Sequence, residues 1–498
     1  MAKGSDPWEL VRTMCKESLE AVNDRFWGPR SGGSYVALDG GEGDQSAELP
    51  LNENGATPSS LRARGYGTSW HTRNVVRRVL MFLLPSFLAR ALGHVDEDAA
   101  IPAVTTTSYL NGLRGLAATF VAIYHNTDDF LWVHRGWGQT PEDYYLVQLP
   151  FIRLVYAGGS YMVSIFFVIS GFALTYSPLK KCHAGQGADA IAALPSSIFR
   201  RPFRLFMPVV PALLATTVAT QNQWFYQAPM RSPMGPVVSG IRSYFPFIWG
   251  TLVTIITNST TGTILPPGWT LSIEYQGSLL VFMCCLAFAR TSAPVRIFCV
   301  FALLAFFLHH AQWQSCLFLA GMILGDIRHV RQKLPPLEGR AHKVASTASW
   351  LLLVVSLFFG GWPTHGDGYA AAWYSWFAWV PTSGVEPTRF FVGVGAIGLV
   401  AALENLPVLQ RGLCSRAILY LGEISYSLYL LHWLIARSSP VWGLRYRMLD
   451  AGYSMGFAWT ATFVIMMVFC IWLGDIHWRL FDQKSVRFSH WLTKTLGI

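Results

Sequence analysis

Charged residues are scarce in this chain of 498 residues, of which only 13% are Asp, Glu, Lys or Arg while 52% are hydrophobic. Soluble domains usually carry about twice that charged fraction. The mean hydropathy is +0.34. The composition therefore excludes an ordinary soluble domain and predicts an all-α fold, a polytopic membrane bundle of about ten transmembrane helices.

Two chemical signatures are also missing. The sequence has no GxxxxGK[ST] and no HExxH pattern, so it gives no sign of a phosphate-binding loop or of zinc peptidase chemistry. The eight cysteines form no CxxC pair, and we expect neither a metal site nor structural disulfides. The net charge of +10 comes from Lys and Arg in short loops between apolar runs, which favours membrane topology over nucleic-acid binding.

The N-terminal part has no apolar h-region, so we expect no cleavable signal peptide. Residues 1–68 have Gly-, Ser- and Asn-rich patches and are predicted to be a mostly disordered cytosolic region. Residues 70–93 are basic and apolar but too short to cross a bilayer. We expect an amphipathic helix there on the cytosolic membrane surface.

Apolar runs between residues 108 and 482 define the membrane domain, and residues 483–498 are expected to form a cytosolic tail. Ten runs are candidate spans. They are 109–125, 154–176, 203–220, a fourth from 268 onwards, 297–309, 313–327, 346–361, 389–403, 418–436 and 454–474.

Positive charge orients these spans. With the N-terminus in the cytosol, the basic loops 178–202 and 328–345 and the tail all fall inside. The apolar piece 245–256 must then be re-entrant or lumenal, and the sequon at Asn258 is a candidate lumenal glycosylation site. Arg437, Arg445 and Arg447 do not fit, because they lie in an outer loop. An endomembrane such as the endoplasmic reticulum is the expected location.

The first predicted span carries two polar residues that have to be explained, Arg114 and His125. Their spacing of eleven places both on one face of a helix, about 16 Å apart along its axis. Intramembrane ionisable groups mark a function by default. The alternative is that Arg114 snorkels to the surface and His125 merely ends the helix.

The predicted topology converts sequence position into depth. His125, Glu274 and His432 fall at similar depth in the outer half, where a carboxylate beside a histidine would make a general base. Structural hydrogen bonds are the alternative for Glu274 and His432. A second set falls toward the cytosol and suits an anionic ligand, although topology alone could explain its paired arginines. It comprises Arg114, Ser170, Arg200, Arg201 and Arg204.

Five motifs in order resemble the acyltransferase 3 family of integral-membrane O-acyltransferases. They are Asn-Gly-Leu-Arg-Gly at 111–115 with His125, and the segments 166–172, 200–204, 269–274 and 424–432. Residues 480–483 depart from the Glu-Arg-Pro that often follows the last span of the family. The long N-terminal extension and the Trp-rich outer loops are more similar to fungal members.

The resemblance implies transfer of an acyl group, often acetyl, from acyl-CoA to a hydroxyl. It implies that His125 is the base or acid of the reaction and that Arg114 helps to hold the donor or the acceptor. The leading hypothesis is that His125 is the general base and that Glu274 orients its ring. Its motifs add candidate substrate-binding residues, namely Ser170, Arg201, Arg204, Trp269, Ser272, Tyr429 and His432. No bound cofactor is expected, because acyl-CoA is a co-substrate. The implied acceptor is a small lipophilic molecule such as a terpenoid or polyketide.

Two other functions remain open on the sequence. An integral-membrane isoprenoid cyclase could use the same buried His and Glu as acids. The aromatic content of 14% permits this, but membrane interfaces also enrich aromatic residues. A transporter could also hold intramembrane charges, although the spans show no inverted repeat.

Overall fold

The computed structural model describes residues 79–93, 101–222, 224–225, 243–257 and 264–498. The boundary between two units of the chain, Met1–Thr105 and Thr106–Ile498, falls after Thr105. In the first unit, helix α3 covers Ser86–Ala91 after Pro85, whose ring ends the helical residues before it. The predicted disordered region 1–68 lies outside the described residues. The expected surface helix 70–93 is described only from residue 79, and its place on a membrane stays a prediction.

The second unit is helical throughout, and its described residues contain no β-strand beyond an isolated bridge between Phe225 and Ser438. Its α-helices are α4 (Ser108–Asn126), α5 (Arg153–Ala157), α6 (Gly159–His183), α7 (Gly187–Phe206), α8 (Val209–Gln221), α9 (Tyr244–Thr257), α10 (Trp269–Phe288), α11 (Ala293–His309), α12 (Trp313–Gln332), α13 (Gly339–Gly360), α14 (Pro387–Leu403), α15 (Pro407–Leu413), α16 (Arg416–Ala436), α17 (Leu444–Asp450), α18 (Met455–His477) and α19 (Gln483–Leu496). Short 3-10 and π turns join them, including η2 (Leu131–His134), η5 (Pro266–Gly268) and η9 (Trp478–Asp482).

The described residues contain six helices long and apolar enough to cross a membrane, or seven if the bent pair α14 and α15 counts as one. The expected number of about ten spans is therefore not confirmed. Helix α4 is long enough but is not among the six, because Asn111, Arg114 and His125 lower its hydropathy. Helix α11, with 17 residues, falls just short in length.

Two sequence-based boundaries need correction. The region 178–202 is not a basic loop, because α6 continues to His183 and α7 begins at Gly187. The third span, predicted at 203–220, is longer than expected, because α7 and α8 follow each other with only a short turn between Phe206 and Val209 and count together as one candidate spanning helix, Gly187–Gln221. The apolar piece 245–256 forms α9, whose 14 residues fall short of the roughly 20 that a spanning helix needs.

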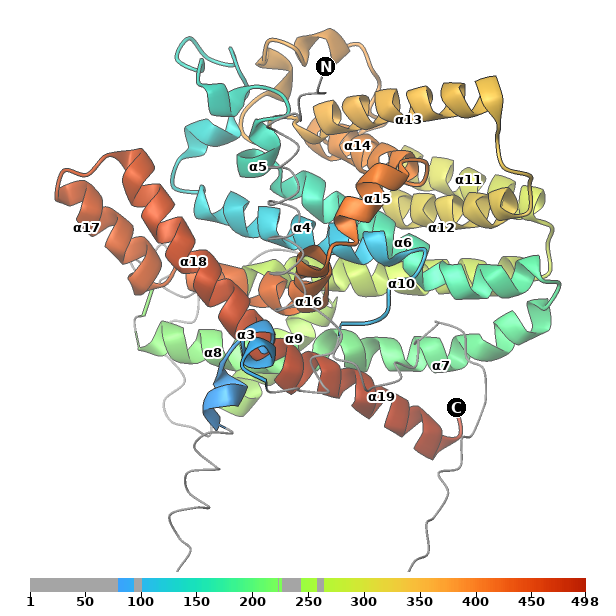
Figure 1. Cartoon of the computed structure of the whole chain (residues 1–498), viewed down its shortest axis with the longest axis horizontal. Helices are drawn as coiled ribbons and strands as arrows, with labels where there is room; N and C mark the ends of the chain where they lie inside the picture. Colours follow the sequence, from blue (N-terminus) through green and yellow to red (C-terminus); the bar gives the residue numbers. More distant parts are fainter. Residues whose placement is uncertain (1–78, 94–100, 223, 226–242, 258–263) are drawn as a thin grey trace, which may run out of the picture. The chain divides into compact units, whose positions relative to one another are not determined.

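Most of the long helices, including α6, α10, α12 and α13, have roughly parallel axes, whereas α18 and α19 are inclined to them (Figure 1). Helices α4, α6 and α16 are central and largely buried, whereas α13 and α18 lie at the periphery. The peripheral helices keep large apolar side chains exposed, such as Leu351 and Val355 on α13 and Val464 and Val468 on α18. Such surfaces suit lipid rather than water.

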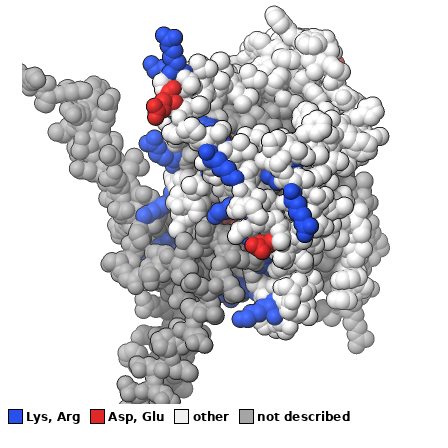
Figure 2. Space-filling view, turned by 90° about the vertical axis from the view of Figure 1, so that its right-hand side faces the viewer, with Lys and Arg blue, Asp and Glu red and all other residues white. Residues whose placement is uncertain are grey.

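Basic residues gather at one end of this bundle. Figure 2 looks at the right-hand side of Figure 1, and Lys and Arg clearly outnumber Asp and Glu on that face. Lys333 after α12 donates to the carbonyl of His183 at the end of α6 over 2.5 Å, so two basic helix ends meet here. The gathering agrees with the positive-inside argument used above.

Glycines allow the closest helix contacts. A Cβ atom on Gly115 of α4 would lie 2.5 Å from the backbone nitrogen of Gly422 on α16. In α14 the run Gly-x-Gly-x-x-Gly at 393–398 lies inside a helix, where a Cβ atom on Gly395 would lie 2.7 Å from the carbonyl of Ser356 on α13. Small residues of this kind let membrane helices approach closely, so that run packs helices together.

We predict that Gly115→Ala destabilises the protein by about 1–3 kcal/mol or more, because the methyl group must push α16 away. The midpoint of thermal unfolding in detergent measures the effect. Gly456→Ala in α18 is the matched control, since a Cβ atom there has nothing within 4 Å. Equal midpoints for the two variants would contradict the close contact of α4 and α16.

Candidate active site

Two helices that run in the same direction carry the site. At one end, the amide of Asn111 in α4 donates to Glu423 in α16 over 2.7 Å. At the other, the rings of His125 and His432 stack with centroids 5.2 Å apart and planes inclined by 28°. Helices α4 and α16 are therefore parallel, and two polar layers form along them.

We call the first of these layers the histidine layer, comprising Tyr124, His125, Asp128, Tyr429 and His432. The second is the arginine layer, comprising Arg114, Arg201, Arg204, Glu274, Glu423 and Asp482. The eleven residues from Arg114 to His125 separate the layers by about 16 Å along α4.

His125 lies in the last turn of α4, and its Nδ1 is 3.0 Å from Oδ2 of Asp128 in the following loop. Burial alone would raise the pKa of Asp128, but the hydrogen bond and charge of His125, together with Arg437, hold that pKa below its ordinary value. Asp128 is therefore a carboxylate at neutral pH and accepts the Nδ1 proton. In the neutral ring Nε2 then keeps its lone pair, as a general base requires.

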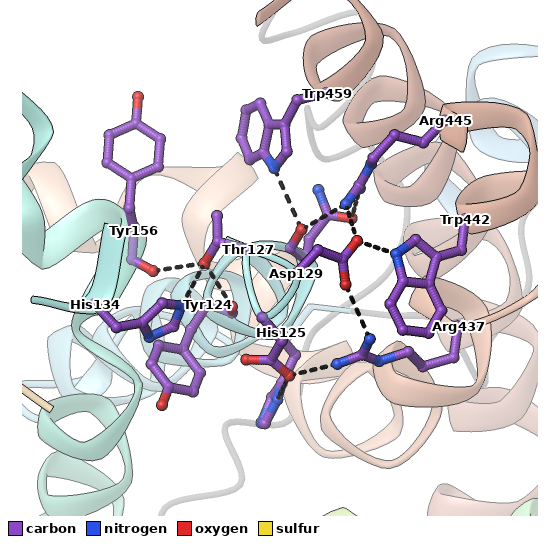
Figure 3. A network of polar contacts seen from close by, with 12 residues as sticks. Tyr124, His125, Thr127, Asp129, His134, Tyr156, Arg437, Trp442, Arg445 and Trp459 are labelled. Carbon is purple, nitrogen blue, oxygen red and sulfur yellow. Dashed lines mark hydrogen bonds and ion pairs between the residues drawn. The ribbon is translucent and has the colours of Figure 1, made fainter. Parts of the chain in front are cut away.

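The aspartates after α4 are held by arginines from the segment between α16 and α18 (Figure 3). Arg437 bridges Asp128 and Asp129 at 2.8 and 3.1 Å, and Arg445 contacts Asp129 at 2.9 Å. Arg445 also donates to the carbonyl of Asn126, the last residue of α4, over 3.0 Å. These pairings explain Arg437 and Arg445, the misfit arginines of the topology argument, because they neutralise carboxylates beside His125.

His432 is fully buried in α16. Its Nδ1 lies 2.7 Å from the carbonyl oxygen of Tyr429. A carbonyl only accepts, so Nδ1 carries the proton and Nε2 is an acceptor. Within the described part of the chain, Nε2 has no hydrogen-bond partner. A buried acceptor without a donor is costly, which points to a hydroxyl ligand or a water.

Glu274 does not contact His125, and the expectation that it orients that ring is corrected. Its carboxylate pairs with Arg201, which also donates to Ser278 over 2.9 Å. Helix α10 runs antiparallel to α16, with Thr270 meeting the hydroxyl of Tyr429 at 2.9 Å. Glu274, one turn further along α10, therefore lies toward the arginine layer. Asp128 takes the position beside His125.

The remaining members of the arginine layer balance one another. Arg114 and Arg204 both interact electrostatically with Asp482, at the junction of η9 and α19. Arg114 also interacts with Glu423. The three guanidiniums thus face three carboxylates, and Arg204 is an exposed residue.

The remaining residues predicted to bind substrate lie at different levels along the helix axes. Trp269 is the first residue of α10, at the level of the histidine layer. Ser272 accepts from Gln276 over 3.2 Å within the same helix. Ser170 lies one turn beyond Phe166, whose ring is 5.7 Å from that of Tyr429. The structure places Ser170 in neither layer, and Asn258 lies outside the described residues.

A second buried histidine supports Tyr124. His134 Nε2 is 3.1 Å from the hydroxyl of Thr127, which donates to the carbonyls of Tyr124 and Tyr156 at 2.7 and 3.0 Å. Arg153 donates to the carbonyl of His134 over 2.8 Å. Burial lowers the pKa of His134 to about 4, so the ring is neutral at pH 7.

Comparison with known proteins agrees with this geometry. A family model described as an acyltransferase domain matches residues 107–478, which include α4, α10 and α16. The chain belongs to the acyltransferase 3 family. The resemblance expected from the five motifs is thereby confirmed.

Curated relatives of this acyltransferase 3 family member are fungal. O-acetyltransferase PaAT-1 of Phomopsis amygdali is 30% identical over 437 residues, covering 78% of this chain and 85% of the relative. Acyltransferase clz18 of Cochliobolus lunatus is 22% identical over 391 residues, covering 67% of this chain and 83% of its own. Acyltransferase R4 of a Phoma species is 22% identical over 410 residues, covering 68% and 86%. No solved structure matches the chain. The family and the first relative support O-acyltransferase activity.

Sequence reasoning missed several residues of this acyltransferase's site. Asp128 stands three residues after His125, close enough to reach back to the end of the helix, and this spacing was a usable signal. The positions of Arg437 and Arg445 against the positive-inside rule were a second signal. Nothing in the sequence pointed to His134, because its partner Thr127 is recognisable only in the fold.

We predict a loss of about 2 kcal/mol of unfolding free energy between pH 7 and pH 5 that depends on His134. The folded-state pKa is lowered to about 4, so its contribution is complete above the ordinary pKa of 6.5 and is lost as pH falls toward 4. Chemical unfolding in detergent at both pH values measures it. His134→Gln should lack this component of the pH dependence, and an unchanged pH dependence in that variant would contradict the assignment.

Proposed function

We propose that this protein transfers an acetyl group from acetyl-CoA to a hydroxyl of a small lipophilic acceptor, with His125 as general base. The observation that carries the proposal is the setting of His125, whose Nδ1 is held by Asp128 while Nε2 has no hydrogen bond among the described residues. Such an imidazole can accept a proton because the carboxylate supports the charge that forms.

The chemistry balances without a covalent enzyme intermediate. Nε2 of His125 takes the proton of the acceptor hydroxyl as its oxygen attacks the thioester carbonyl. The carbon–sulfur bond breaks, and the leaving thiolate of CoA receives that proton from the imidazolium. Asp128 keeps the ring oriented throughout, and the orphaned Nε2 of His432 would accept from a second polar hydrogen of the acceptor or from a water.

The donor would enter from the basic end of the bundle. Arg114, Arg201 and Arg204 are suited to its phosphates, since guanidiniums bind phosphate bidentately. The distance of about 16 Å between the layers suits a thioester at the end of a long arm. Because Glu274 and Asp482 neutralise this layer, the phosphates would have to displace part of the existing pairing.

The acceptor side is proposed around Trp269, Tyr429 and His432, with Ser272 further along α10 and Ser170 on α6. A terpenoid or polyketide would suit these aromatic walls. We place the protein in the endoplasmic reticulum or another endomembrane, with a cytosolic N-terminus and a lumenal Asn258. Family membership and the named O-acetyltransferase relative favour acyl transfer over the cyclase and transporter alternatives.

Membranes that contain the protein, radiolabelled acetyl-CoA and a lipophilic metabolite extract of the source organism test the proposal. We expect label in an organic-soluble product, and a 10²- to 10⁴-fold lower rate with His125→Ala. His342→Ala, an exposed histidine of α13, is the matched control and should behave as wild type. Equal rates for wild type and His125→Ala would refute the role of His125.

The variant Asp128→Asn tests whether the carboxylate of Asp128 orients and supports the His125 ring or only packs beside it. The amide keeps the shape of the side chain but cannot support an imidazolium, so we expect kcat to fall about 10²-fold or more with little change in KM for acetyl-CoA. Steady-state rates against acetyl-CoA concentration measure the split. Unchanged kcat would show that Asp128 only packs beside His125.

A further inference from the structure

Arg389, the third residue of α14, is held between the rings of two tryptophans. Its guanidinium carbon lies 5.5 Å from the ring centroid of Trp269 and 5.0 Å from that of Trp313. The two tryptophans therefore fix the guanidinium by cation–π contacts. A cation–π contact is not a hydrogen bond, so it leaves the N–H edges of the guanidinium for hydrogen bonds.

Those edges are almost unused by the protein. Among the described residues, Arg389 donates only to Ser160, at a long 3.5 Å, and its Nε lies 3.7 Å from Glu386, a side chain that is 64% exposed. The guanidinium has five N–H donors, so most of them remain open. The side chain of Arg389 is 27% exposed, so a ligand can reach it.

Within the part of the chain that the structure describes, the exposed Glu386 is the only carboxylate paired with this charge. Arg389 is in the first turn of α14, Trp269 and Trp313 begin α10 and α12, and Ser160 is the second residue of α6. Four helix N-termini, each with partial positive charge, thus surround a cation. An arginine is disfavoured at such a place unless an anion joins it.

A second cation strengthens the field. Arg153 is fully buried, and it has no ion pair with a carboxylate among the described residues. Its Nε and Nη1 have no hydrogen-bond partner there either. Arg153 and Arg389 both interact electrostatically with Tyr124. Two guanidiniums therefore flank one residue of the histidine layer.

Arg389 is linked to the histidine layer through shared neighbours on two sides. On one side Tyr124 meets His125 edge-on, with ring centroids 5.1 Å apart. On the other side Trp269 precedes Thr270, which bonds Tyr429, whose ring centroid is 5.6 Å from that of His432. The same end of the bundle thus holds the orphaned Nε2 of His432 and an open guanidinium.

We propose that Arg389 is the binding site for a carboxylate on the acceptor, and that the protein acylates hydroxy acids. The carboxylate would take the open edge of Arg389 while the hydroxyl of the same molecule reaches His125 and His432. This inference rests on the proposed acyl transfer and names the class of acceptor that the site selects.

The test separates the lipophilic extract into acidic and neutral fractions on an anion-exchange resin and offers each with radiolabelled acetyl-CoA. We expect wild-type membranes to label the acidic fraction, and the product to stay on the resin because its carboxylate survives acylation. Alkaline phosphatase should leave it there. Release by phosphatase would identify a phosphate as the anion and overturn the carboxylate assignment.

Variants of Arg389 then locate the anion. Arg389→Gln should raise KM for the acidic fraction about 10- to 100-fold, the loss expected for a charged hydrogen bond, without changing KM for acetyl-CoA. The KM of Arg389→Lys for the acidic fraction should lie between those of wild type and Arg389→Gln, because lysine keeps the positive charge but cannot form the paired hydrogen bonds of a guanidinium. Arg447→Gln, an exposed arginine of α17, is the matched control.

Three outcomes contradict the inference in different ways. Labelling of the neutral fraction alone would show that no acidic group is needed. An Arg389→Gln variant with a raised KM for acetyl-CoA would assign Arg389 to the donor. Absence of label from both fractions with wild type would overturn the acyltransferase proposal itself, and this inference with it.

Discussion

The close contact of α4 with α16 is the constraint on which the site depends. Gly115 and Gly422 let the two backbones approach until no Cβ atom would fit between them. Further along the same two helices, the rings of His125 and His432 stack. The contact also keeps the helices parallel, so that residues spaced along α4 meet partners at matching heights on α16. A packing feature therefore determines where the polar chemistry can occur.

The ion pairs of the histidine layer and of the arginine layer have different effects. In the histidine layer, Arg437 and Arg445 reach over from the segment after α16 and pair with Asp128 and Asp129. These pairs leave Asp128 ionised next to His125. In the arginine layer the positive and negative groups largely offset one another, as in the pair of Arg201 with Glu274. The histidine layer can therefore hold a proton on His125, whereas the ion pairs of the arginine layer can be exchanged for pairs with a ligand.

The open guanidinium of Arg389 stands apart from both arrangements. Several buried arginines elsewhere in the bundle meet carboxylates, as Arg296 meets Asp326 through two hydrogen bonds of 2.6 and 2.7 Å. Arg389 instead meets two aromatic faces and an exposed, distant glutamate. A cation without a close counter-ion is costly in a low-dielectric setting. Arg389 beside the histidine layer is therefore best understood as a binding site for an anion.

The sequence by itself determined the helical membrane character, the family, and the shared face of Arg114 and His125, because composition, motif order and helical periodicity are local properties. It also placed His432 at the depth of His125, since depth follows from position along a span. Only the tertiary structure decided that Asp128 rather than Glu274 supports His125, and that Arg437, Arg445 and Arg389 belong near the site. These pairings join segments far apart in the chain, and which side chain reaches which partner depends on helix rotation and on close glycine contacts that periodicity does not specify.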